Sequence, residues 1–277
     1  MDKQVWVIAG VFGTYVLIEL LLGVFHPRQA TRRESLLDIL AASQAWFLVA
    51  PLVVYFSAAL QRWLLPQHAD AWAATPWWLQ VLALLIADDM VQYWYHRSAH
   101  RYGWLWGMHK FHHSAPYMGI RVIWRNGFFY DLLMPNLYLA SILVYLGFGE
   151  VYFWYYAVKL LVTMGSHSEL RWDRWLYRHR ALAPLAWIVE RILSTPATHF
   201  AHHAALHDPV GNPHGNFGNL MFLWDVIFGS ARITRQYPQE YGLPEEPGGV
   251  PDPWYVYIFY PLLRARRPAP PPVAEGG

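Results

Sequence analysis

The stretch H-R-S-A-H-R-Y-G-W-L-W-G-M-H-K-F-H-H, residues 96–113, holds five histidines at helical spacings. On a helix, His96 and His100 lie about one turn apart and share a face. The next three follow the i, i+3, i+4 spacing of a second helix face: His109, His112 and His113. The same H-x-x-H-H pattern recurs at residues 199–203. This repeated spacing predicts that the histidines act together as one site.

The histidines of these boxes are candidate metal ligands. Neutral imidazole binds iron, zinc, copper and nickel, and a thiolate site is excluded because the chain has no cysteine. A single zinc ion takes about three or four ligands, so eight histidines predict two metal ions. His167 or His179 could supply a ninth ligand. The eight box residues are His96, His100, His109, His112, His113, His199, His202 and His203.

The composition indicates a membrane protein. Hydrophobic residues make up 55% of the chain and charged residues only 14%, against about 25% charged in an ordinary soluble domain. The 16 Trp and 18 Tyr suit the aromatic belts of membrane interfaces. A net charge of +2 without a basic stripe does not favour a nucleic-acid partner. We therefore expect one all-α polytopic membrane domain with about four to five transmembrane helices.

Apolar segments of about 20 residues, the length that a bilayer crossing needs, alternate with polar loops. The expected spans are 5–25, 36–65 and 77–95, followed by a transmembrane hairpin over 128–164 that turns at 147–150. Arg28, Arg32 and Arg33 form a basic loop, which the positive-inside rule assigns to the cytoplasm. With this topology every histidine box reaches the cytoplasmic face.

The chain is expected to divide into three parts. Residues 1–84 form N-terminal transmembrane helices, residues 85–234 form the catalytic domain, and residues 235–277 form an interfacial segment and a disordered Pro-rich tail. Nearly all basic residues are arginine and only three are lysine, and this bias toward arginine hints at a bacterial source. We therefore expect an integral protein of a bacterial inner membrane.

An all-histidine site for two irons beside apolar helices predicts O2 chemistry. With two electrons added, such a site would oxidise an unactivated C–H bond, which requires a dry and shaped cavity. Hydroxylation is expected rather than desaturation, because oxygen transfer is the default fate of the substrate radical. Zinc is not redox-active and would instead indicate a membrane hydrolase, but the boxes contain no H-E-x-x-H motif. A noncatalytic metal transporter is a third alternative, although its histidines should line a transmembrane pathway.

Three polar residues near the boxes are candidates for catalytic roles. Asp89 lies seven residues before His96, about two helical turns away, so we expect it to accept the N–H of a ligand histidine. An ionisable side chain at membrane depth is costly and functional by default. Glu169 lies two residues after His167 and could act in the same way. Arg125 stands among aromatic residues, where it could pair with an acid or hold a polar substrate head group.

Five motifs resemble the fatty acid hydroxylase/sterol desaturase superfamily of integral-membrane di-iron oxygenases. They are D-x-x-x-Y-W-Y-H-R-x-x-H (89–100), W-x-x-H-K-x-H-H-S (106–114), H-S-E (167–169), T-P-A-T-H-x-x-H-H (195–203) and G-N-F-G-N-x-x-F-L-W-D-x-x-F-G (215–229). The sequence is most similar to the branch of this superfamily that holds C-5 sterol desaturases and alkylglycerol monooxygenases, and the similarity covers residues 85–234.

The resemblance implies a cytoplasmic helical cap that carries two iron ions. It also implies O2-dependent hydroxylation or desaturation of a sterol, fatty acyl or alkyl ether lipid, with electrons from a separate donor of the cytochrome b5, ferredoxin or reductase type. The local H-S-E motif makes His167 the expected ninth ligand, although His179 lies nearer the family's usual distance from the last box. His207 and His214 follow that box and remain candidates for a ligand, a supporting residue or a loop position.

Overall fold

The structure, a computed structural model, describes residues 2–243 and 252–264. Within these residues there are helices and loops, with two isolated β-bridges and no longer strand. The predicted Pro-rich tail at 268–272 lies outside the described residues. The first elements are α1 (Asp2–Leu21), α2 (Arg32–Gln44), π-helical η1 (Ala45–Val49), α3 (Ala50–Leu64), α4 (Trp77–Leu84), π-helical η2 (Leu85–Met90) and α5 (Val91–Arg101).

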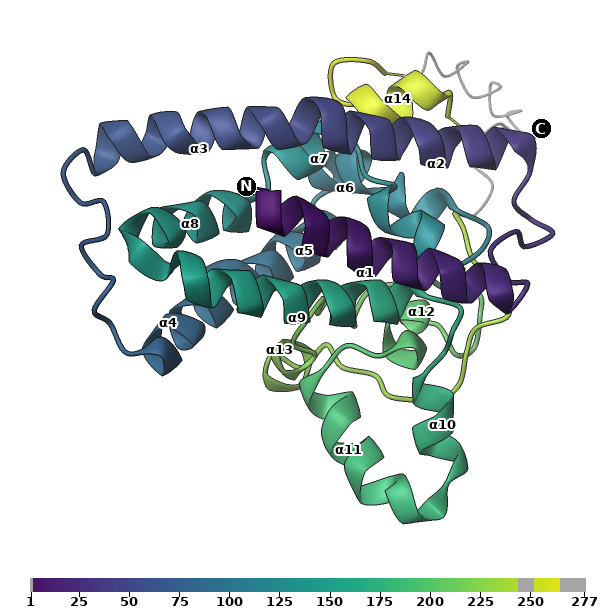
Figure 1. The fold of residues 1–277 in the computed structure, drawn as a ribbon. Helices are drawn as coiled ribbons and strands as arrows, with labels where there is room; N and C mark the ends of the chain where they lie inside the picture. Colours follow the sequence, from purple (N-terminus) through teal and green to yellow (C-terminus); the bar gives the residue numbers. More distant parts are fainter. Residues whose placement is uncertain (1, 244–251, 265–277) are drawn as a thin grey trace, which may run out of the picture.

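The remaining elements carry the other boxes and the second long hairpin. They are α6 (Gly103–His109), η3 (His112–Ser114), η4 (Ile120–Trp124), α7 (Phe128–Leu132), α8 (Pro135–Leu143), η5 (Val144–Phe148), α9 (Gly149–His167), α10 (Asp173–Arg178), η6 (Arg180–Leu182), α11 (Ala183–Ile192), α12 (Pro196–His203), α13 (Leu223–Ile227) and α14 (Trp254–Phe259). The helices α10 and α11 project together from the rest of the fold (Figure 1).

Two helical segments are long and apolar enough to cross a membrane, Arg32–Leu64 and Phe128–His167, and Val5–Leu21 is a shorter apolar helix. The first combines α2, η1 and α3 into one long helix along one side of the molecule (Figure 1). The fold is thus helical with two candidate membrane helices. The larger number of spans expected from the sequence stays a prediction.

The second long segment is bent back on itself at Gly147. This residue has φ of 114°, a conformation that is readily available only to glycine. A Cβ atom here would lie 2.7 Å from the backbone nitrogen of Ala73. The turn makes α8 and α9 neighbours in Figure 1 and returns the chain toward His167, at the place where the sequence predicts a turn.

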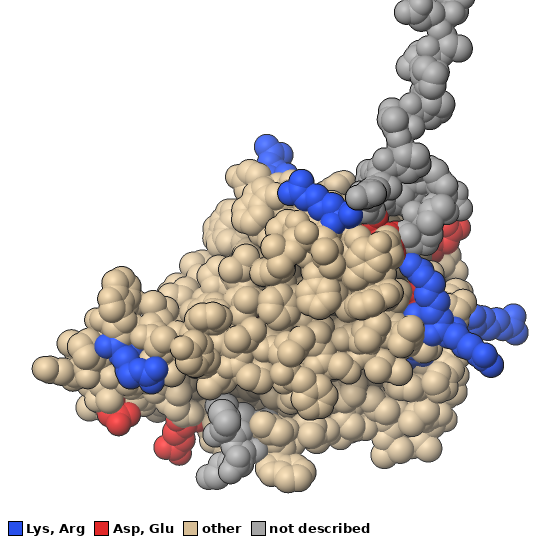
Figure 2. Space-filling view, turned by 90° about the horizontal axis from the view of Figure 1, so that it is seen from above, with Lys and Arg blue, Asp and Glu red and all other residues tan. Residues whose placement is uncertain are grey.

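The surface of the long α2–α3 helix is apolar and uncovered. Phe47 and Trp63 each expose 78% of their surface, and Ile39 and Tyr55 each expose 63%. In Figure 2 the charged side chains lie toward the margins of this face, and a broad band without them separates the margins. An apolar surface of this extent is unfavourable in water, so we assign it to contact with lipid. The protein is a membrane protein.

A buried polar network holds α5 against α8 and α9. Asp88 lies in η2, and its carboxylate accepts hydrogen bonds from Asn136 (2.7 Å), Tyr155 (2.9 Å) and Lys159 (2.6 Å). Both Asp88 and Lys159 are buried, where an unpaired charge would be very costly. The network therefore fixes the helix that carries the first histidine box.

Candidate metal centre

Nine buried or partly buried histidines gather in two groups whose ligand atoms lie within 4.8 Å of one another in each group. The first cluster is His96, His100, His109, His113 and His202. The second cluster is His112, His167, His199 and His203. These are the eight box residues together with His167. The two clusters adjoin, because the rings of His113 and His203 stack at a centroid distance of 4.4 Å.

Local sequence fixes the start of α12, which contributes to both clusters. The Thr195 hydroxyl accepts from the backbone N–H of Thr198, while the Thr198 hydroxyl accepts from the backbone N–H of Thr195. This reciprocal cap, followed by a proline in the first turn, is a strong helix start. His199 and His203 then lie at i and i+4 and enter the second cluster, whereas His202 faces the first.

The chain between 109 and 114 differs from the sequence prediction of one continuous helix. Helix α6 ends at His109, and a separate 3₁₀ turn holds His112 and His113. The tighter turn separates the two neighbours, so that His112 joins the second cluster while His113 joins the first. The H-x-x-H-H spacing therefore supplies both clusters rather than one helix face.

Backbone carbonyl groups fix the tautomers of three ring systems. The Nδ1–H groups of His96, His167 and His202 donate to the carbonyls of Phe217 (2.8 Å), Thr163 (2.7 Å) and Gly215 (2.7 Å). With the proton on Nδ1, each Nε2 carries a free lone pair. This arrangement is typical of metal-binding histidines, whose second nitrogen is held by a neighbouring acceptor.

The free lone pairs point at one another. The Nε2 atoms of His96 and His202, neither of which carries a proton, are 3.0 Å apart. Two acceptor nitrogens at this distance repel unless a cation lies between them. Other ring nitrogens in the clusters are buried and have no hydrogen-bond partner among the described residues, including Nε2 of His100 and Nε2 of His203. The donor set therefore fits metal ions.

Burial keeps the rings outside the membrane-spanning segments neutral. Desolvation, and then the neighbouring imidazoles, lower the pKa of His109, His113, His199 and His203 well below the usual 6.5. Neutral imidazole is the form that binds a metal. At neutral pH the site therefore presents ligands that do not have to lose a proton.

None of the other candidate histidines belongs to either cluster. His179 is exposed and packs its ring on Trp175 at 5.4 Å. His207 is exposed and pairs with Glu240, and His214 is exposed in a loop. Of the two candidates for a ninth ligand, His167 is the one that joins a cluster.

Asp89 has different partners from the expected one. Its carboxylate accepts from the backbone N–H groups of Leu220 (3.3 Å) and Met221 (3.1 Å) and from the indole of Trp224 (2.8 Å). The expected acceptor role toward a ligand histidine is taken by the Phe217 carbonyl, which receives the His96 proton. The reason is that η2 faces the 217–224 segment, so Asp89 positions this segment rather than a ring.

Glu169 and Arg125 are both held in ion pairs. The Glu169 carboxylate pairs with Arg171 through two hydrogen bonds of 2.7 and 2.9 Å. Arg125 is fully buried and pairs with Glu34 at 2.5 Å and with Asp38 at 3.4 Å. The prediction left open whether Arg125 pairs with an acid or holds a head group, and the structure gives it two acids.

Sequence reasoning did not assign the residues that support the rings. The Asp225 carboxylate accepts from the N–H groups of Phe217 (2.8 Å) and Gly218 (2.7 Å), which fixes the carbonyl that binds His96. The Tyr130 ring stacks on His109 at 4.4 Å. The Gly- and Asn-rich motif at 215–219 indicates a loop after the last histidine box. The sequence does not show that backbone carbonyls of this loop accept hydrogen bonds from the histidine rings.

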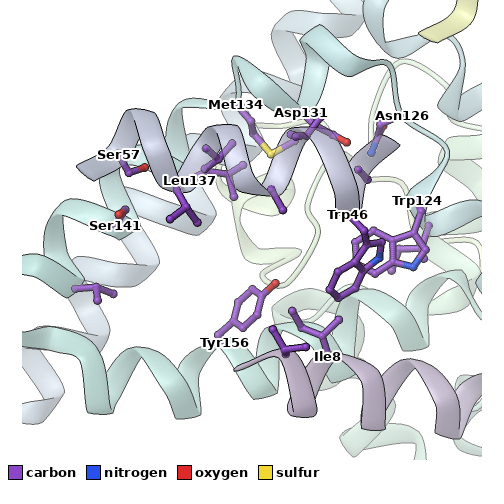
Figure 3. A pocket seen from close by; sticks show the side chains of 18 of the residues that line it. Ile8, Trp46, Ser57, Trp124, Asn126, Asp131, Met134, Leu137, Ser141 and Tyr156 are labelled. Carbon is purple, nitrogen blue, oxygen red and sulfur yellow. The ribbon is translucent and has the colours of Figure 1, made fainter. Parts of the chain in front are cut away.

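An apolar cavity of about 470 Å³ lies among α1, η1, α3, η4, α7, α8, η5 and α9 (Figure 3). Aromatic and aliphatic side chains make up most of its wall, including Trp46, Trp124, Leu137 and Tyr156. Its volume falls within the roughly 300–1,000 Å³ of typical ligand pockets. The cavity adjoins the apolar cluster of Met108, Tyr130 and Met134 and so reaches the neighbourhood of His109.

A second, more polar cavity of about 400 Å³ lies beside the first cluster. Its lining includes His100 and Phe217 together with the basic residues Arg97, Arg101 and His214. His100 is the one histidine of the two clusters that is only partly buried. This cavity therefore gives the first cluster its contact with a basic surface.

Comparison with known proteins gives one family and several relatives, among them two alkylglycerol monooxygenases. A sequence model of the family described as fatty acid hydroxylase matches residues 81–230. An alkylglycerol monooxygenase from Danio rerio is 31% identical over 210 residues, which cover 70% of this chain and 39% of that protein. An alkylglycerol monooxygenase from Caenorhabditis elegans is 27% identical over 183 residues, or 61% of this chain and 30% of that protein. The chain thus spans less than half the length of these relatives. No solved structure matches significantly.

Proposed function

Because the chain belongs to the fatty acid hydroxylase family, we propose that it is a membrane-bound oxygenase that hydroxylates a C–H bond of a lipid with O2. One observation carries the proposal. Nine histidines form two adjoining buried clusters near an apolar cavity. The relatives named alkylglycerol monooxygenase support an oxygen-dependent reaction on a lipid, whether sterol, fatty acyl or alkyl ether.

We propose that the two clusters each hold one iron ion. The first cluster offers five imidazoles and the second offers four. When bound, the iron pair supplies the redox chemistry with which O2 oxidises an unactivated C–H bond. Carbonyls at Phe217, Thr163 and Gly215 hold three of the rings with Nε2 toward the centre of their clusters.

The chain's own residues keep water from the reaction. All but one of the nine histidines are buried, and the cavity wall is mainly apolar. Tyr130 covers His109 with its ring, and α7 places the same residue next to the cavity. Exclusion of water protects a reactive oxidant from side reactions. Hydroxylation remains the proposed outcome over desaturation.

Neither alternative function has support in the arrangement of polar groups. A zinc-dependent hydrolase needs a carboxylate base at the metal, but Asp89 is engaged by backbone N–H groups and Glu169 by Arg171. A metal transporter needs ligands along a pathway through the membrane. The histidines instead gather in two compact groups.

We propose the topology that the sequence predicts. Residues 85–234 form the catalytic domain, residues 1–84 anchor it, and the metal centre faces the cytoplasm of a bacterial cell. The basic residues Arg28, Arg32 and Arg33 near the start of α2 support this orientation through the positive-inside rule.

We also propose that the external electron donor, of the cytochrome b5, ferredoxin or reductase type, docks at the polar cavity beside His100. Arg97, Arg101 and His214 line this cavity and would attract an acidic donor surface. Here the donor comes nearest to the one cluster histidine that is partly exposed.

The test is O2 consumption by the purified, iron-loaded full chain in lipid vesicles with an artificial reductant. We expect consumption to be coupled to the appearance of hydroxylated lipid, and a His199→Ala variant to lose both. Cleavage of esters or amides without O2 would contradict the proposal. A His179→Ala variant, which changes an exposed ring outside the clusters, should retain activity.

A further inference from the structure

One acidic side chain lines the apolar cavity without a partner of its own. Asp131 lies in α7, within a helical segment long enough to span a membrane. Its carboxylate has no hydrogen bond or ion pair with residues 2–243 or 252–264. An unpaired carboxylate among apolar groups is costly, and an ionisable residue at membrane depth is functional by default. A ligand that forms a hydrogen bond with the Asp131 carboxyl group would remove this cost.

Asn126 provides a second polar group at the same edge of the cavity. Its side-chain Oδ1 is buried without a hydrogen-bond partner in the described part of the chain, while its backbone carbonyl accepts from Gln44. Figure 3 shows Asp131 and Asn126 near each other, with Ser57 and Ser141 farther away along the wall. A carboxyl and an amide together offer both acceptors and donors to a ligand.

This polar edge lies close to the metal centre. Asp131 directly follows Tyr130, whose ring stacks on His109 at 4.4 Å. Met134, one helical turn further along the chain, lines the cavity and belongs to the same apolar cluster as Tyr130 and Met108. A ligand that binds Asp131 with its polar end therefore brings its nearest carbons toward the first histidine cluster.

We propose that Asp131 determines substrate specificity by binding the head group of the lipid, and that it selects an uncharged head that carries a hydroxyl. A hydroxyl group can donate to the Asp131 carboxylate or to the unpartnered Oδ1 of Asn126. The carboxylate head of a fatty acid would instead place two acids side by side in an apolar cavity. They cannot both be ionised there, and the proton uptake that binding then requires at pH 8 weakens the complex. The apolar remainder of the cavity holds the hydrocarbon chain.

This inference rests on the proposed function only in calling the ligand a substrate, so the test measures binding without turnover. Purified full chain in nanodiscs is titrated under nitrogen at pH 8 with tritiated 1-hexadecanol and with tritiated hexadecanoate. The two probes share their chain length and differ in the head group. We expect the alcohol to bind at least about tenfold more tightly, as one hydrogen bond to a charged group is worth that factor or more.

Two variants separate charge from hydrogen bonding. Asp131→Asn removes the charge at constant size, so hexadecanoate should bind about tenfold more tightly than to the parent while the alcohol is held about equally. Asp131→Leu removes both properties and should weaken the alcohol about tenfold. Ser57→Ala changes the same cavity away from Asp131 and should leave the ratio of the two affinities unchanged.

The proposal is overturned if the parent protein does not prefer the alcohol, or if Asp131→Asn and Ser57→Ala give the same affinity ratio. Thermal unfolding of each variant is measured alongside, because a merely structural role of Asp131 would lower stability without changing the ratio. If lipid oxidation fails but the ratio responds to Asp131→Asn, the head-group assignment stands and the oxygenase proposal falls.

Discussion

The Nε2 atoms of His96 and His202 face each other at 3.0 Å across 106 residues of sequence. Both rings donate their Nδ1–H to backbone carbonyls, of Phe217 and Gly215. Neither facing nitrogen therefore holds a proton in the neutral ring. A metal ion bound to both nitrogens would remove this repulsion.

Loss of a ligand should matter more in the second cluster than in the first. His113 and His203 stack on each other and are similarly buried, at 5% and 3% exposure, so alanine at either position removes a comparable ring. His203→Ala leaves three ligands in its cluster, whereas His113→Ala leaves four. Because a metal site with fewer ligands binds more weakly, we expect His203→Ala to lose more iron during graded chelation. Equal loss from the two variants would contradict the division into clusters, and His179→Ala serves as the control.

Acid should destabilise the metal-free protein. Burial lowers the pKa of His109, His113, His199 and His203 in the fold well below 6.5. Below the unfolded pKa the unfolded chain binds more protons than the folded chain, so stability falls as the pH drops below about 6.5. The measurement is the unfolding temperature of chelator-treated protein from pH 8 to pH 5. Metal-loaded protein should resist until protons displace the metal, and a flat profile for the metal-free form would be inconsistent with buried neutral rings.

The buried Asp88–Lys159 pair should be costly to break from one side only. Lys159→Met leaves the Asp88 charge without its cation, which typically costs about 3–5 kcal/mol. Adding Asp88→Asn removes the remaining charge while an amide can still bond with Tyr155 and Asn136. We therefore expect the double variant to recover most of the stability, as measured by denaturation in detergent micelles. Additive losses in the double variant would show that the charge pairing is not the cause.

Asp89 should act on the metal centre through the 217–224 segment. In Asp89→Asn one carboxylate oxygen becomes a donor. Either the Leu220 N–H or the Met221 N–H then loses its acceptor, because the two groups donate to different oxygens. Displacement of the segment would release the Phe217 carbonyl from His96, and losses of this kind lower metal affinity by about 10–100-fold. Trp224→Phe removes only the indole bond and should have a smaller effect. Iron affinity measured by competition with a chelator tests both, and an unchanged Asp89→Asn value would remove this positioning role.

Charge reversal beside His100 should slow electron delivery without removing metal. Arg101→Glu places an acid in the cavity next to the first cluster, so the apparent KM for an acidic donor protein should rise several-fold, and more at low salt. Arg62→Glu reverses an exposed arginine near the end of α3 and is the matched control. Turnover with a small neutral reductant should remain the same in both variants. A similar rise in KM for Arg62→Glu would point to a general charge effect rather than a docking site.

The histidine clusters were largely visible in the sequence because helical spacing is a local property. The i, i+3 and i+4 intervals identify all eight box residues, and the H-S-E motif at 167–169 favours His167 over His179 as the ninth ligand. The division into clusters was not visible, since it depends on a 3₁₀ turn that separates His112 from His113.

Partners that are distant in the chain could not be predicted in this way. The sequence predicts that Asp89 accepts from a ligand histidine about two turns along its own helix, but its donors lie 131 to 135 residues later in the chain. Arg125 was recognised as unusual, yet its acids lie on α2, which precedes it by 87 to 91 residues. The position of the expected cavity could not be predicted either, because its wall combines side chains from eight helical elements.

Family similarity begins at residue 81, but three acids of the preceding helices complete the fold around the metal centre. Glu19, fully buried in α1, accepts from the Ile120 and Glu169 N–H groups and from the Ser168 hydroxyl, and Glu34 and Asp38 neutralise Arg125. A recombinant fragment that begins at residue 81 would leave the buried Arg125 guanidinium without its two acids. It would also lack Glu19, which binds Ser168 and Glu169 next to His167. The segment that matches the family is therefore shorter than the part of this chain whose buried contacts support the metal centre.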